Sequence, residues 1–215
     1  QDLVAHSRNA LQAQHGGKLM PIRDVQFVKG QYYHIYNRGA NRLSIFRNDA
    51  DFRLVLNLIK KVSIACNLSI IAYCLMPNHY HWLIRQNGEA PARLLPQRVF
   101  GSYTRKFNHR YERSGTLFEG RFKANLVEDD VYLRHLCRYI HANPVKDGFA
   151  LAPDLWPYSN YLEWIQKRNG SLVDRAFVED FFSTPSAYAA FVAAYAEERS
   201  QVPDAVRWYL DSLDA

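Results

Sequence analysis

Two short apolar runs separated by a two-residue turn place the strongest constraint on how this chain folds. Residues 69–76 and 79–85 are rich in β-branched and aromatic side chains, and Pro77 and Asn78 separate them. Runs of this length and composition on either side of a turn are typical of β-strands. We therefore expect two adjacent strands joined by a tight turn.

Two more strands and two helices are predicted around this pair. Residues 31–37 and 121–127 have strand-like composition. Apolar residues recur at helical spacing over residues 49–67, where aspartates are suitable N-caps. A second helix is predicted to begin at Pro96, and its aromatic stripe is more typical of core packing than of a ligand surface.

A last helix is predicted over residues 129–141, because Asn143, Pro144 and Gly148 are stop signals. The resulting order β, α, β, β, α, β, α matches a ferredoxin-like split βαβ layout. In this α+β fold an antiparallel sheet has helices on one face, and we expect the last helix at the sheet edge. Other α+β topologies are also compatible with the order.

The chain divides into three parts. Residues 1–19 have little strand pattern, and we expect Met20 to be the natural start, with a non-native or flexible segment before it. Residues 20–150 contain the predicted sheet and its helices. Residues 151–215 begin with a loop rich in proline and tryptophan and continue as alanine-rich and aromatic stretches, which predict a helical C-terminal extension.

Composition excludes wholesale disorder and favours a polyanionic partner. The chain is 48% hydrophobic and 22% charged, which is typical of globular proteins. Lysine and arginine number 27 against 21 acidic residues, which gives a net charge of +6. Such a balance suits nucleic acid without requiring it.

Cysteine usage and hydropathy indicate a soluble cytoplasmic protein. Cys66, Cys74 and Cys137 are odd in number and have no C-x-x-C spacing, so we expect buried free thiols in a reducing compartment. No apolar run approaches the roughly 18 residues of a membrane span, and the N-terminal residues lack an apolar signal segment.

A His-x-His pair lies in the second strand of the predicted pair. Side chains alternate along a strand, so His79 and His81 are expected on the same face of the sheet. Two neighbouring imidazoles can hold a metal ion. The alternative is a pair of partly buried histidines that hydrogen-bond to backbone, and the short motif alone does not decide between them.

A second polar group follows helical spacing. His135, Tyr139 and Asn143 are four residues apart and would share one face of the last helix, opposite the core-facing Leu136 and Ile140. We therefore expect Tyr139 on a surface where packing does not require it, which favours a chemical role. A structural tyrosine is the alternative.

The two groups are chemically complementary. A tyrosine hydroxyl has a pKa of about 10, so its attack on phosphorus requires a cation or a base beside it. Two imidazoles and an amide oxygen leave open positions for water and phosphate, as octahedral Mg²⁺ or Mn²⁺ requires, and zinc is also possible. The ion would polarise the scissile phosphate while Tyr139 attacks and becomes a 5′-phosphotyrosine.

Four ordered segments together resemble a known family. They are YHIYNRGANRLSIF, YCLMPNHYHWLI, GTLFEGRFKA and RYIHANPVKDG, and the resemblance spans roughly residues 20–161. In these segments the chain resembles the single-tyrosine HUH transposases, and most closely the REP-associated tyrosine transposases. The match depends on several motifs in order rather than on one.

The resemblance implies a ferredoxin-like catalytic domain over residues 20–150 that cuts and joins single-stranded DNA near hairpins. The family's HUH histidines fall on His79 and His81, its tyrosine nucleophile on Tyr139 and its amide metal ligand on Asn143. Tyr80 replaces the usual large hydrophobe between the histidines. Related enzymes use the tyrosine helix in cis or in trans, so both a monomer and a homodimer are compatible.

Six basic side chains are candidate contacts for DNA phosphates. They are Arg38, Arg42, Arg105, Lys106, Arg121 and Lys123. Two other functions stay open beside the transposase: a domesticated hairpin-DNA-binding protein without turnover, and a metal-dependent nuclease that activates water and in which Tyr139 is structural. The cytoplasmic protein would be nucleoid-associated when bound to DNA.

Overall fold

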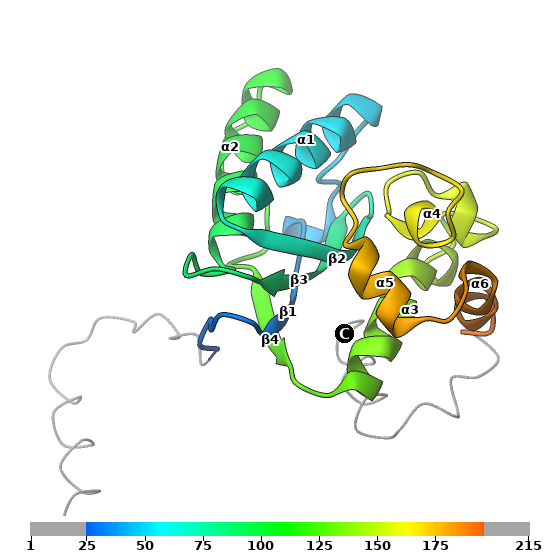
Figure 1. Ribbon diagram of the computed structural model, residues 1–215. Helices are drawn as coiled ribbons and strands as arrows, with labels where there is room; N and C mark the ends of the chain where they lie inside the picture. Colours follow the sequence, from blue (N-terminus) through cyan, green and yellow to red (C-terminus); the bar gives the residue numbers. More distant parts are fainter. Residues whose placement is uncertain (1–24, 196–215) are drawn as a thin grey trace, which may run out of the picture.

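The computed structural model describes residues 25–195, and a four-stranded antiparallel sheet is its central element (Figure 1). The strands are β1 (Tyr32–Arg38), β2 (Leu68–Leu75), β3 (His79–Gln86) and β4 (Lys123–Val127), in the spatial order β2-β3-β1-β4. All neighbouring strands are antiparallel. The predicted split βαβ arrangement is confirmed, whereas residues 1–19 and the expected start at Met20 lie outside the described residues.

Helices lie on both faces of the sheet. The helices α1 (Asp49–Ala65) and α2 (Leu94–Arg110) lie side by side over one face, as predicted (Figure 1). The helix α3 (Asp130–Lys146) was expected at the sheet edge, but it packs against the opposite face. The reason is that the apolar side of α3 meets Leu83 of β3 and the inward residues of β2.

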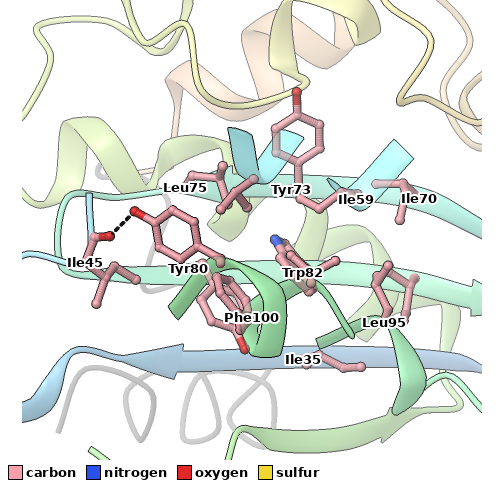
Figure 2. Close-up of a cluster of buried hydrophobic side chains, with 14 of the residues drawn as sticks. Ile35, Ile45, Ile59, Ile70, Tyr73, Leu75, Tyr80, Trp82, Leu95 and Phe100 are labelled. Carbon is pink, nitrogen blue, oxygen red and sulfur yellow. Dashed lines mark hydrogen bonds between the residues drawn. The ribbon is translucent and has the colours of Figure 1, made fainter. Parts of the chain in front are cut away.

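The face under α1 and α2 holds the larger hydrophobic core. Figure 2 shows the rings of Tyr80, Trp82 and Phe100 lying together in this core. Trp82 stacks on Phe100 with ring centroids 5.1 Å apart, and Tyr80 contacts the same ring at 4.4 Å. Tyr103 and Phe107 are also buried, so the predicted core role of the α2 aromatic stripe is confirmed.

The helix α3 continues past the point where the sequence predicts its end. Pro144 lies inside the helix, and Asn143 keeps helical geometry before it. A proline in the last turn removes one backbone hydrogen bond, here the one to the carbonyl of Ile140. Ala142 and Pro144 are buried, and burial of these apolar side chains offsets the loss, so the helix ends only at Lys146.

Smaller helices and turns complete the described chain. They are the 3-10 turns Ala40–Arg42 and Pro153–Leu155 and the helices α4 (Tyr161–Trp164), α5 (Arg175–Phe181) and α6 (Pro185–Ala193). None of the helices between residues 25 and 195 combines the length and the apolar character that a bilayer span requires. All three cysteines are buried free thiols, as predicted.

The chain that follows α3 covers the outer edge of β2. Asn160 accepts a hydrogen bond from the backbone N–H of Tyr73 at 2.8 Å and donates to the carbonyl of Ile71 at 2.8 Å. The N–H of Leu75 donates to the carbonyl of Tyr158 at 2.9 Å. These bonds satisfy backbone groups that an exposed edge strand would leave open to other chains.

The same extension also buries the outer side of α3. His141 of α3 lies with Nδ1 2.5 Å from the hydroxyl of Tyr188 and with Nε2 2.9 Å from Oδ1 of Asn160. Trp164 packs on Tyr188 with ring centroids 4.5 Å apart. The helix α3 is therefore enclosed between the sheet and the extension.

An ion pair fixes the loop that carries these contacts, and it gives a stability prediction. Arg168 donates to both carboxylate oxygens of Glu163, at 2.6 and 2.7 Å, and the Glu163 side chain is 5% exposed. Arg168→Ala leaves that carboxylate buried and uncompensated, so we expect a loss of about 3 kcal/mol in the free energy of unfolding. Urea denaturation followed by circular dichroism measures it.

The neighbouring pair supplies the control. Lys167 contacts Asp154 at 3.0 Å, and the Lys167 side chain is 62% exposed. Lys167→Ala should change the unfolding free energy by less than about 0.5 kcal/mol. Equal losses in the two variants would contradict the role assigned to the Arg168 pair.

Candidate active site

Strand alternation builds the first half of the site. Tyr80 and Trp82 point into the core under α1 and α2, so His79 and His81 lie on the face toward α3. Their ring centroids are 5.2 Å apart. Tyr36 of β1 faces His81 across the antiparallel ladder. The two histidines therefore lie on one face of the sheet, as the sequence predicts.

The helix α3 brings the second half of the site to these histidines. Oδ1 of Asn143 lies 3.0 Å from Nε2 of His79. The ring of Tyr139 meets the ring of His81 edge-on, with centroids 5.4 Å apart. The four residues that the sequence singles out for the reaction and the metal therefore lie together, although they come from two distant segments.

Tyr139 is buried, which corrects the expectation of a surface position. Its side chain is 1% exposed, and its ring lies 6.3 Å from the ring of Tyr195 and 5.3 Å from Nζ of Lys146. Asn143 is fully buried. The polar side of α3 is enclosed because the extension packs on it, and helical spacing alone does not report such tertiary contacts.

A cavity of about 630 Å³ opens in front of the histidines. Five basic side chains line it against two acidic ones, so its walls attract anions. The basic residues are Arg38, Arg42, Arg121, Lys123 and Lys146, and the acidic ones are Glu119 and Asp147. Phe149 and Tyr36 add aromatic surface.

Four of the six predicted DNA contacts lie at this cavity, and two do not. Arg38, Arg42, Arg121 and Lys123 line it. Arg38 is also ion-paired with Glu119. Arg105 and Lys106 are exposed on α2, which covers the opposite face of the sheet, so the structure does not bring them to the site.

Lys146 and Asp147 are two of the polar residues at the site that the sequence prediction does not include. Lys146 lines the cavity and contacts Asp147 at 3.0 Å, and Asp147 lies 3.6 Å from Nε2 of His79. Lys146 follows Asn143 by three residues, so helical spacing would have found it if the helix had been continued past the proline.

Burial keeps the inner imidazoles neutral. It lowers the pKa of His34, behind His81, to about 3. Burial is the main reason that the pKa of His81 lies well below its usual range, and the neighbouring His34, His79 and Lys146 lower this pKa further. A neutral imidazole is the form that donates a lone pair to a metal, so His81 is ready to act as a ligand at neutral pH.

The spacing of the remaining donors fits a divalent cation. Nδ1 of His79 lies 2.8 Å from Oδ1 of Asn78, and a proton shared there leaves the Nε2 lone pair facing the Asn143 oxygen. Two ligands about 2.1 Å from an octahedral ion are about 3.0 Å apart when adjacent, which matches the separation in this structure. Within residues 25–195 the amide nitrogen of Asn143 has no hydrogen-bond partner.

The donor set is two imidazoles and one amide. Across the described residues, no three His, Cys, Asp or Glu side chains gather as a metal cluster. Two imidazoles and an amide oxygen occupy three positions of an octahedron and leave the others to water and substrate oxygens. The residues present therefore fit Mg²⁺ or Mn²⁺.

Comparisons with known proteins identify relatives by sequence and by fold. A REP-associated tyrosine transposase candidate from Haemophilus influenzae is 32% identical over 107 residues, which cover 42% of this chain and 57% of that protein. A solved structure of a REP-associated tyrosine transposase bound to a REP hairpin superimposes with a TM-score of 0.55 at 20% identity. That superposition covers 72% of this chain and 94% of the other, and at this identity it supports the fold.

The family assignment comes from the sequence profile described as "Transposase IS200 like". This profile matches residues 27–143, which is more than half of the chain and contains the strands β1 to β4 together with His79, His81, Tyr139 and Asn143. The chain therefore belongs to the IS200-like transposase family.

Proposed function

We propose that this transposase is a metal-dependent endonuclease and strand transferase that acts on single-stranded DNA beside hairpins. One observation carries the proposal. Tyr139 contacts His81, Asn143 contacts His79, and both histidines line a basic cavity. A nucleophile, a set of metal ligands and an anion-binding wall are the three parts that phosphodiester transesterification needs.

His79, His81 and Asn143 would hold Mg²⁺ or Mn²⁺. When bound, the ion would supply charge that polarises the scissile phosphate and stabilises the leaving oxygen. Both histidines line the cavity, so the charge that they would help to hold lies beside the space proposed for the substrate phosphate. Asn78 holds the outer nitrogen of His79 at 2.8 Å, and this contact fixes which nitrogen faces inward.

Tyr139 would be the nucleophile. Its hydroxyl loses its proton to water as the oxygen forms a bond to phosphorus, and the bond from phosphorus to the 3′-oxygen breaks. The 3′-oxygen takes up a proton and leaves as a 3′-hydroxyl, and the 5′-phosphate stays on the tyrosine. The ammonium of Lys146 lies 5.3 Å from the Tyr139 ring centroid. It would stabilise the negative charge that develops on the tyrosine oxygen during the attack. Because Tyr139 is 1% exposed, its side chain or those covering it must move before the phosphate reaches the hydroxyl.

Hairpin-associated DNA is the proposed substrate. The similar solved structure is of a protein bound to a REP hairpin, and this chain shares its fold. The cavity carries an excess of three basic side chains, and Phe149 is 46% exposed on its wall. Positive charge beside an exposed aromatic ring is suited to phosphates and unstacked bases of a single strand.

The remaining parts of the proposal concern the cell and the assembly. A reducing cytoplasm suits three buried free thiols, and contact with DNA would place the protein at the nucleoid. Both a monomer and a homodimer are compatible with the proposed chemistry. Here Tyr139 lies beside the histidines of its own chain, which favours attack in cis.

The covalent intermediate gives the first test. We expect the wild-type protein, incubated with Mn²⁺ and labelled single-stranded DNA from hairpins flanking its own gene, to form a protein-linked 5′ fragment. Tyr139→Phe should abolish this slow-migrating band on denaturing gels, because the attacking oxygen is missing. Chelation with EDTA should also abolish it.

Tyr132→Phe is the matched control, because it removes a hydroxyl from the same helix, two turns before Tyr139. It should retain the band. Cleavage without a protein-linked band, and unchanged in Tyr139→Phe, would contradict the nucleophile and favour activated water. Binding without cleavage across metals and oligonucleotides would favour a DNA-binding protein without turnover.

The cavity wall gives a second test. Arg121→Ala combined with Lys123→Ala removes two phosphate-binding charges, so the affinity for single-stranded DNA should fall and its salt dependence should weaken. Each lost contact lowers the slope of log K against log salt by about 0.7. Fluorescence anisotropy across a salt series measures both quantities.

Arg105→Ala combined with Lys106→Ala is the charge-matched control from the opposite face of the sheet. The cavity hypothesis expects little change in slope for this variant. An equal change of slope in both variants would mean that DNA extends over α2 and contacts Arg105 and Lys106, as the sequence predicts.

A further inference from the structure

A fully buried histidine lies directly behind the candidate metal ligands. His34 of β1 has no exposed surface, and its Nε2 lies 3.0 Å from Nδ1 of His81. The two rings are nearly parallel, with centroids 5.2 Å apart, and Tyr36 stacks on His34 at 4.8 Å. Among the described residues, His34 does not line the cavity, so DNA bound there as proposed would not contact it.

The sheet fixes the position of this imidazole. His34 faces Leu83 across the ladder between β1 and β3, and Tyr36 faces His81. His34 and His81 are therefore diagonal neighbours on one face, a distance that long or aromatic side chains span. An apolar residue would fill the same space without needing hydrogen bonds, whereas a buried imidazole is costly unless its nitrogens are bonded.

The hydrogen bond between the two rings constrains the proton on His81. The bond uses Nδ1 of His81 and leaves Nε2 as the nitrogen available to a cation. If the shared proton is on His81, Nδ1 donates to His34 and Nε2 keeps a lone pair. If it is on His34, neutral His81 carries its proton on Nε2 and cannot ligate a metal.

We propose that His34 is a positioning residue for His81. It accepts the Nδ1–H of His81 and so keeps Nε2 unprotonated and aimed at the cation. This proposal rests on the proposed metal-dependent function, because it assigns a partner to one ligand of that site. His34 touches neither the cation nor the DNA, and it acts only through the orientation and tautomer of His81.

Mn²⁺ binding to the DNA-free protein tests this role without relying on activity. Electron paramagnetic resonance of free Mn²⁺ would be titrated against wild type, His34→Phe and His34→Gln. His34→Phe keeps a ring but removes the acceptor, so we expect Mn²⁺ affinity to fall about 10- to 100-fold. His34→Gln restores an acceptor oxygen and should recover most of the affinity.

Tyr103→Phe is the control for loss of a buried hydrogen bond, because its hydroxyl bonds to the carbonyl of Ile45 at 2.5 Å on the other side of the sheet. It should bind Mn²⁺ as the wild type does. Unchanged affinity in a folded His34→Phe would overturn the role of His34 and leave the metal site intact. If the wild type binds no better than His79→Ala, the metal site itself fails, and the role of His34 falls with it.

A measurement on the wild-type protein covers the case in which His34→Phe does not fold. Two-bond ¹H–¹⁵N correlation spectra of the imidazoles, recorded with Mg²⁺, report which nitrogen carries the proton. We expect His81 to be protonated at Nδ1. Protonation at Nε2 would overturn the proposal.

Discussion

The packing of α3 across the sheet face that carries His79 and His81 is the contact on which the rest of the structure depends. Without it, the histidines would line an open sheet face, and Tyr139 and Asn143 would belong to a separate helix. The apolar side of α3 meets β2 and Leu83, and this burial places the next turn of the helix against the histidines. Hydrophobic packing thus sets the 3.0 Å approach between Asn143 and His79, because the polar groups themselves contribute little net attraction.

One strand serves both the core and the site. Alternate side chains of β3 point to opposite faces, so Tyr80 and Trp82 anchor the strand under α1 and α2 while His79 and His81 face α3. A shift of one residue in the register would exchange the two sets and remove both the core and the site. The extension strengthens the arrangement, because it pairs with the edge of β2 and encloses α3 from outside.

The sequence predicts those parts of the site that follow from local periodicity. A period of two places His79 and His81 together, and four-residue helical spacing relates Tyr139 to Asn143. Their approach across the fold follows from the family resemblance and not from spacing. The burial of Tyr139 depends on contacts made by residues 151–195, and the packing of α3 on the open sheet face depends on its contacts with β2 and Leu83. No local sequence pattern reports either set of contacts. The contact between His34 and His81 could not be predicted, because it depends on the register between β1 and β3, which is a tertiary property.

The central claim is that the fold brings His79, His81 and Asn143 to a single cation. A crystal of the protein soaked with Mn²⁺ and measured near the manganese absorption edge tests this most directly. The account predicts one strong anomalous peak in contact with Nε2 of His79, Nε2 of His81 and Oδ1 of Asn143, at about 2.0 to 2.3 Å from each. A fully occupied Mn²⁺ elsewhere in the cavity, with the Asn143 oxygen still directly against His79, would contradict it.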